Sequence, residues 1–227
     1  MNKINLPQAS ILALGTLQSL LLSLAIAQWA IADDANTVQQ VFADYKSAIL
    51  TSSGDRAVDK LSQSTIDYYG EMRKLAVCES AETVKAESMV NRVQILSMRF
   101  RVPTETLVEL SDREVVVYAV DRGWIGEESV MKLDVAEVTI EGEEALAEVV
   151  RNGEPTGIQF RFVKETEGWK FDLLSTIELT NQTFEQLAEV QGLKPDEFIF
   201  AVLEILEGRT PTKDIWNPVA PDDPLCV

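Results

Sequence analysis

The 227-residue sequence contains no histidine. This absence excludes Ser-His-Asp and Cys-His catalysis, zinc sites with histidine ligands, and acid–base chemistry by imidazole. The sequence also lacks a Walker A loop, a dinucleotide-binding glycine pattern and a Gly-x-Ser-x-Gly elbow. We therefore expect no cofactor, and no catalytic motif identifies an enzyme.

Basic residues are few: 20 Lys and Arg stand against 37 Asp and Glu, a net charge of −17. A field of that sign repels phosphate backbones, which argues against a nucleic-acid partner. The acidic turn Glu141, Glu143 and Glu144 lacks the spacing of a calcium loop, so we expect a solvated hairpin tip and no metal site. We interpret Arg99 and Arg101 as surface charges or ion pairs.

The first 32 residues are almost uncharged. Lys3 precedes a run without charge over residues 4–32, and small residues surround Ile31 as a signal peptidase requires. We expect export with cleavage after Ala32, which places the domain in the periplasm or outside the cell. A retained membrane anchor is the alternative, since about 20 apolar residues span a bilayer; a buried core helix is a third. Only this segment would contact a membrane.

The chain has only two cysteines, Cys78 and Cys226. In an oxidising compartment they can pair and fasten the C-terminal tail to the helical region. The alternative is a small buried Cys78 and a free Cys226. No cysteine comes directly after the apolar run, so a lipoprotein anchor is excluded.

Apolar side chains recur at helical spacing before residue 123 and again after residue 180. Residues 115–120 have the composition of a strand, but a capping box of Ser111 and Glu114 just before them favours a helix. The expected helices are, in order, one ending at Leu50, a short one opened by Asp55, one capped by Ser64, residues 82–100, a short one starting at Pro103, one between Ser111 and Gly123, one capped by Thr180 or Asn181 and ended by Gly192, and one from Pro195 to Gly208.

Between residues 138 and 174 the apolar period changes to two, with turns at glycines. This pattern predicts an antiparallel meander with one buried face, which is either core or an apolar pocket. The expected inner positions are Ile158, Phe160, Phe162, Trp169, Phe171 and Leu173. The fold class is therefore α+β, with an N-terminal helical layer on a sheet of four or more strands and two C-terminal helices. We expect one domain over residues 33–208 and an extended, proline-containing tail over residues 209–227.

Phe160-Arg161-Phe162-Val163-Lys164-Glu165, followed by Gly168-Trp169-Lys170-Phe171, resembles the last hairpin of the nuclear-transport-factor-2-like superfamily, the cystatin-like α+β cone. The resemblance covers about half of the chain after residue 32. It implies a helical layer over a cone-shaped sheet. The chain departs from the family where strands between the early helices are missing and two helices follow the sheet, which puts the open cone pocket in doubt.

That superfamily includes ketosteroid-isomerase-like enzymes, which combine a carboxylate base with a Tyr or protonated Asp. The corresponding pocket candidates are Tyr45, Asp67 and Tyr69. Tyr68 and Tyr69 point about 100° apart on a helix, so at most one faces a pocket. The more common alternative is that the tyrosines pack in the core and that Asp67 is exposed to solvent.

We expect an exported, non-catalytic domain that binds a partner protein or a small apolar ligand. A filled core with an exposed apolar patch near Trp216 would favour this binding domain over an enzyme. The rival is a cone-fold enzyme on a small hydrophobic substrate, which needs a buried Asp or Glu in a cavity on the sheet face. A tethered accessory subunit of an envelope complex requires that residues 4–32 be retained.

N-terminal sequencing of the native protein tests the expected cleavage. We predict a mature chain that starts at Asp33, because Ala30 and Ala32 fit the small-residue positions of a signal peptidase site. An intact N-terminus in the membrane fraction would contradict cleavage and support the anchored subunit.

Overall fold

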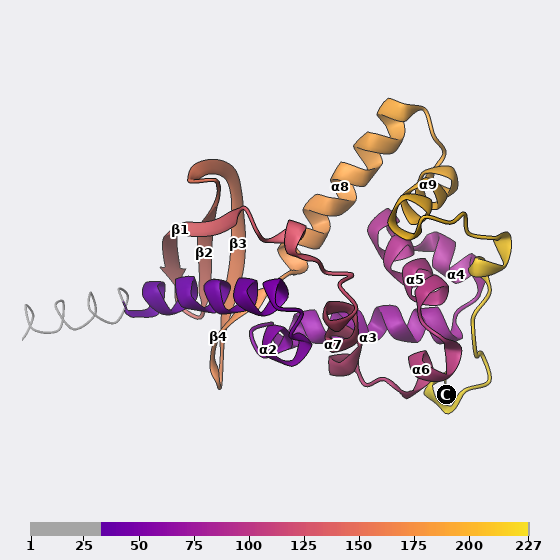
Figure 1. The fold of residues 1–227 in the computed structure, drawn as a ribbon, viewed down its shortest axis with the longest axis horizontal. Helices are drawn as coiled ribbons and strands as arrows, with labels where there is room; N and C mark the ends of the chain where they lie inside the picture. Colours follow the sequence, from indigo (N-terminus) through magenta and orange to yellow (C-terminus); the bar gives the residue numbers. More distant parts are fainter. Residues whose placement is uncertain (1–32, 227) are drawn as a thin grey trace, which may run out of the picture.

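The computed structural model describes residues 33–226, so the expected export segment lies outside the described part. Figure 1 shows a sheet at one end of the molecule and a group of helices at the other, with α8 running between them. The described helices are, in order, residues 33–50, α2 (Gly54–Val58), α3 (Gln63–Cys78), α4 (Ala81–Ala86), α5 (Met89–Arg101), α6 (Thr104–Glu109), α7 (Asp112–Asp121), α8 (Leu174–Gln191) and α9 (Pro195–Glu207). The α+β class is confirmed.

The sheet is a meander in the order β1-β2-β3-β4, every neighbour antiparallel. Its strands are β1 (Leu133–Glu141), β2 (Glu144–Arg151), β3 (Glu154–Glu165) and β4 (Gly168–Asp172). Asn152 and Gly153 connect β2 to β3 with positive φ at both residues, the conformation that a two-residue hairpin requires. The four alternating runs are thus confirmed as one antiparallel sheet.

The inner face of the sheet is filled by the helix over residues 33–50. Phe171 lies at the centre of this core, with ring centroids 5.7 Å from Phe42, 5.3 Å from Tyr45 and 5.1 Å from Phe162. Trp169 is buried beside them. The expectation for Ile158 is wrong: this residue is 37% exposed, because β3 is irregular near its start, where Gly157 has a φ of +73° and the pairing with β2 shifts at a bulge.

The segment before α3 covers the outer edge of β4. Phe171 donates its N–H to the carbonyl of Lys60, and Ser62 N–H donates to the carbonyl of Phe171. Ser62, not Ser64, caps α3: its backbone is extended and its hydroxyl accepts from the Thr65 N–H. The expected cap is therefore two residues too late, because the edge pairing to β4 fixes where the extended chain ends.

The expected single helix over residues 82–100 is wrong, since α4 and α5 are separate. Glu87 and Ser88 are both extended, and the Ser88 hydroxyl accepts from the Asn91 N–H as the N-cap of α5. A serine before an apolar run thus starts a new helix here. The capping box of Ser111 and Glu114 at the start of α7 is confirmed.

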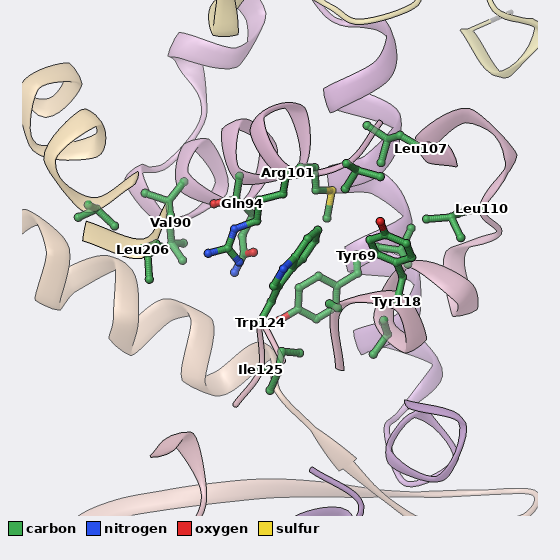
Figure 2. A pocket seen from close by; sticks show the side chains of 18 of the residues that line it. Tyr69, Val90, Gln94, Arg101, Leu107, Leu110, Tyr118, Trp124, Ile125 and Leu206 are labelled. Carbon is green, nitrogen blue, oxygen red and sulfur yellow. The ribbon is translucent and has the colours of Figure 1, made fainter. Parts of the chain in front are cut away.

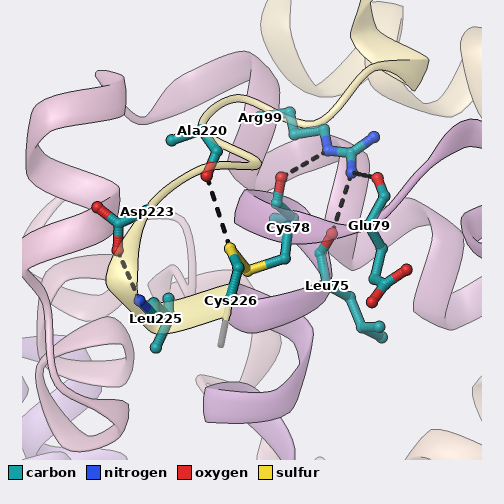
Figure 3. The surroundings of a disulfide bond; sticks show 9 residues. Leu75, Cys78, Glu79, Arg99, Ala220, Asp223, Leu225 and Cys226 are labelled. Carbon is teal, nitrogen blue, oxygen red and sulfur yellow. Dashed lines mark hydrogen bonds between the residues drawn. A yellow bond between two sulfur atoms is a disulfide. The ribbon is translucent and has the colours of Figure 1, made fainter.

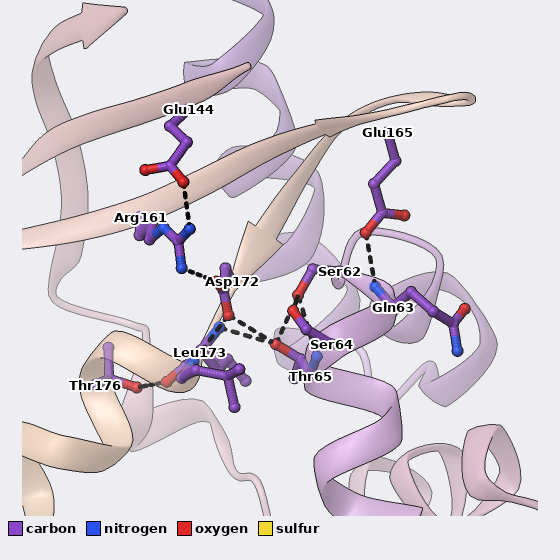
Figure 4. Close-up of polar contacts among 11 residues, drawn as sticks. Ser62, Gln63, Ser64, Thr65, Glu144, Arg161, Glu165, Asp172, Leu173 and Thr176 are labelled. Carbon is purple, nitrogen blue, oxygen red and sulfur yellow. Dashed lines mark hydrogen bonds and ion pairs between the residues drawn. The ribbon is translucent and has the colours of Figure 1, made fainter. Parts of the chain in front are cut away.

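The buried carboxylate of Asp172 joins the end of the sheet to two helices (Figure 4). It accepts from the Thr65 hydroxyl, from the Arg161 guanidinium at 3.0 Å and from the Leu174 N–H at 3.0 Å. Because the Asp172 carboxylate accepts the Leu174 N–H, α8 begins at Leu174. The expected cap at Thr180 or Asn181 is therefore wrong. The hydroxyl of Thr180 instead donates to a carbonyl one turn earlier in α8. The ends of α8 at Gly192 and of α9 at Gly208 are confirmed by left-handed caps.

The tail packs against the helical group. Two 3-10 turns, η2 (Lys213–Trp216) and η3 (Pro224–Cys226), interrupt it, and Ile215 and Trp216 are buried. Trp216 is only 7% exposed and stacks with Phe200 at 6.2 Å. The apolar patch considered near Trp216 is therefore not on the surface, because this side chain fills the helical core.

Gly54 makes a close approach between α2 and α7. A Cβ atom there would lie 2.5 Å from the carbonyl oxygen of Val117, and the Gly54 N–H donates to Asp121 at 2.7 Å. We predict that Gly54→Ala lowers the free energy of unfolding by about 1–3 kcal/mol, because the backbone of α7 must move. This loss exceeds the gain of roughly 1 kcal/mol in helix propensity.

Chemical denaturation of the full chain measures the effect. Gly126→Ala is the matched control, since its φ is negative and the nearest atom to its Cβ would be a carbonyl oxygen at 3.3 Å. An equal midpoint for Gly54→Ala and the unaltered protein would show that the approach of α2 to α7 is not tight.

Candidate functional site: an apolar pocket between the helices

A pocket of about 430 Å³ lies among the helices, away from the sheet face (Figure 2). Its walls come from α3, α5, α6, α7, α8, α9 and the segment after α7. Most lining side chains are apolar: Val90, Val93, Met98, Val102, Leu107, Leu110, Val115, Val116, Ala119, Trp124, Ile125, Phe184, Val202 and Leu206. The volume is within the range of about 300–1,000 Å³ typical of small-molecule sites.

Helix α5 presents one face to the pocket and another to the core. Val90, Gln94, Ser97 and Arg101 recur at steps of three and four residues, so they share a face, and all line the pocket. The opposite face carries Ile95, Leu96 and Arg99, which are buried in the helical core. The spacing of Gln94, Ser97 and Arg101 on one helix face is the signal that sequence analysis missed.

Arg101 is a charged residue of the lining and lies beside Trp124. The Arg101 guanidinium lies 4.8 Å from the centre of the Trp124 ring, and Tyr118 meets the same ring edge-on at 5.4 Å. Figure 2 draws the Arg101 and Gln94 side chains reaching from α5 toward the hollow. Trp124 follows Gly123, whose φ of +70° lets the chain turn sharply after α7.

Tyr69 is the one expected site residue that lines the pocket. Burial raises the pKa of its phenol to about 12, so the hydroxyl stays neutral at pH 7 and can donate a hydrogen bond. Tyr68 meets the Tyr69 ring edge-on at 5.2 Å and donates its hydroxyl to Asn91 at 2.8 Å. Only Tyr69 of the pair faces the pocket.

The other expected residues lie elsewhere. Tyr45 packs on Phe171 in the sheet core, where burial raises its phenol pKa above the usual value. Asp67 is exposed and accepts from the Gln63 amide at 2.7 Å. The structure therefore does not bring Tyr45, Asp67 and Tyr69 into one cavity. Phe162, Trp169 and Phe171 are buried in the sheet core and Phe160 packs against it, so none of the four lines the pocket.

Arg99 is buried, which corrects the interpretation of this residue as a surface charge. Its guanidinium donates five hydrogen bonds to backbone carbonyls, three at the C-terminal end of α3 and two in the tail: Leu75, Ala76, Glu79, Ile215 and Trp216. Loss of hydration lowers its pKa to about 10, and Glu79 opposes the shift. The group therefore stays protonated at neutral pH and holds α5, α3 and the tail together.

A disulfide bond between Cys78 and Cys226 lies close to Arg99 (Figure 3). It links the last residue of α3 to the end of the tail, with Cα atoms 5.5 Å apart. The Ala220 N–H donates to the carbonyl of Val77 nearby. The tail is thus held against the C-terminal end of α3 by a covalent bond, a backbone hydrogen bond and Arg99.

Within residues 33–226 no group of three or more acidic or cysteine side chains is placed to hold a metal ion. In the acidic turn, Glu144 forms an ion pair with Arg161, with an N–O distance of 2.5 Å. No helix in this part of the chain is long and apolar enough to cross a membrane.

No family model, curated protein or solved structure matches the chain. The functional argument accordingly depends on the geometry of the pocket.

We predict that Arg99→Met lowers the free energy of unfolding by about 3 kcal/mol or more, because several buried carbonyls lose a charged donor at once. Chemical denaturation measures it. Arg113→Met is the matched control: Arg113 is partly exposed and pairs with the exposed Asp59 at 2.8 Å, so we expect a loss below about 1 kcal/mol. Equal losses for the two variants would contradict the structural role of Arg99.

Proposed function

We propose that the protein is a non-catalytic binding domain that holds a small apolar molecule in the pocket between α5 and α7. The observation that carries the proposal is the pocket itself, about 430 Å³ and lined mainly by Val, Leu, Ile and aromatic side chains. Transfer of an apolar ligand into such a lining is favourable by roughly 25 cal/mol for each Å² removed from water.

The pocket favours binding over the carboxylate chemistry of a ketosteroid-isomerase-like enzyme. That chemistry needs an acid beside the phenol of Tyr69, and the described lining residues include no Asp or Glu. Asp67, the acid expected from the resemblance, lies exposed outside the pocket. A kinship with the nuclear-transport-factor-2-like superfamily stays a proposal, supported by the first helix lying across an antiparallel sheet.

We further propose that the domain works in the cell envelope or outside the cell. The disulfide between Cys78 and Cys226 supports this location, because such bonds persist mainly in oxidising compartments. Tethering to an envelope complex depends on residues 4–32, which lie outside the described residues. A small ligand is favoured over a protein partner docking at Trp216, since that side chain is buried.

The neutral fluorescent dye N-phenyl-1-naphthylamine tests the proposal, because its emission rises when it enters an apolar site. We predict saturable binding to the full chain, weakened about tenfold or more by Ala119→Phe. Ala119 lines the pocket, so a phenyl ring there occupies space that the ligand needs.

Ala43→Phe is the matched control, since it adds the same atoms at an exposed position of the first helix. It should leave the dye affinity unchanged. An unaltered protein that fails to bind the dye, or equal binding by both variants, would reject the pocket as the binding site.

A further inference from the structure

We propose that the ligand of this pocket is an uncharged apolar molecule with one hydroxyl group, and that Gln94 and Ser97 bind the hydroxyl. This inference rests on the proposed function and adds the chemical class of the ligand. It ranks apolar ethers and apolar carboxylates as weaker ligands.

Gln94 and Ser97 are a pair of neutral polar side chains on one face of α5. They are three residues apart, about one turn, and both line the pocket. Figure 2 draws Gln94 reaching from the helix toward the hollow. Val90, Val93 and Met98 of the same helix also line the pocket and are apolar. The pair therefore forms a small polar patch in an apolar wall.

The side chains of Gln94 and Ser97 have hydrogen-bonding groups to offer a ligand. Both residues are half-buried, and neither side chain forms a hydrogen bond with another residue among residues 33–226. The Thr180 hydroxyl in the same lining differs, because it already donates to the carbonyl of Thr176 at 2.7 Å. A polar group in an apolar site is costly to leave without a partner, so a ligand that supplies one gains affinity.

The chemistry of the pair favours a hydroxyl. A Gln side chain offers an amide donor and a carbonyl acceptor, and a Ser hydroxyl can both donate and accept. A ligand hydroxyl matches this set, since it can donate to the Gln94 carbonyl while it accepts from the Ser97 hydroxyl. An ether oxygen only accepts, so it would leave the Gln94 carbonyl without a donor.

The charges around the pocket favour an uncharged ligand. Arg101 lines the pocket, but its guanidinium is already engaged and lies 4.8 Å from the centre of the Trp124 ring. A carboxylate would therefore have to exchange its hydration for neutral partners, which is costly. The net charge of −17 also repels an anion as it approaches. A hydroxyl group loses less hydration and is not repelled.

Competition with the bound dye tests the inference on the full chain at pH 7, with 1-decanol and 1-methoxynonane as probes. The two are isomers, and only decanol can donate a hydrogen bond. The ether is the less polar isomer, so burial of apolar surface alone would favour it. We expect decanol to displace the dye at about three- to tenfold lower concentration, as one neutral hydrogen bond provides. Decanoate, which is charged at pH 7, should need a higher concentration than decanol.

Two variants of α5 locate the effect. Gln94→Leu should remove the preference for decanol while 1-methoxynonane still displaces the dye, which also shows that the variant is folded. Ser97→Ala should lower the preference by about twofold or more, since one hydrogen bond is lost. Gln186→Leu is the matched control, because Gln186 is exposed on α8 and does not line the pocket; it should behave as the unaltered protein.

Three results would overturn the inference and leave the apolar pocket in place. They are equal or stronger displacement by 1-methoxynonane, stronger displacement by decanoate, and a decanol preference that survives in Gln94→Leu. A dye that does not bind the unaltered protein is a different outcome, because the proposed function then fails first and the ligand class falls with it.

Discussion

The position of α5 depends on one buried guanidinium. Arg99 donates to carbonyls at the end of α3 and in the tail, two segments more than 130 residues apart in the chain, so one side chain fixes three segments at once. A charge buried in this way is stable only where its N–H groups all find acceptors. The carbonyls at a helix C-terminus suit it, because most of them lack partners within the helix and they carry the negative end of its dipole.

The same helix builds the pocket from its other face. With Arg99, Ile95 and Leu96 held in the core, the stripe from Val90 to Arg101 faces α7 and Trp124. Arg101 thus stands two residues from Arg99 and points into the pocket, while Arg99 points into the core. The disulfide of Cys78 and Cys226 secures the third segment that Arg99 contacts. The backbone of α5 therefore links the buried Arg99 to the pocket-lining Arg101.

Features decided by neighbouring residues could be predicted from the sequence. The capping box of Ser111 and Glu114 identified α7 despite its strand-like composition, and the glycines between the alternating runs identified the turns, including the one at Asn152 and Gly153. Features decided by distant residues could not. Ser62 caps α3 because β4 pairs with the chain beside it, and α8 begins at Leu174 because Asp172, held by Arg161 and Thr65, accepts its N–H.

The pocket among the helices was not predicted for the same reason. Apolar alternation left the sheet face open as either core or an apolar pocket, and the first helix fills that face with Phe42 and Tyr45. Of the expected residues only Tyr69 lines the actual pocket. The spacing of Gln94, Ser97 and Arg101 was visible in the sequence. Neighbouring residues do not distinguish Arg101 from Arg99, because Arg99 is buried by the tail and Arg101 lies against Trp124.

The most direct test of the account is a crystal structure of the protein with 1-bromonaphthalene, read from the anomalous signal of bromine. The account predicts one strong peak inside the helical pocket, at its apolar part near Leu107 and Leu110. A peak on the sheet face or on the surface, with the helical pocket empty, would contradict it.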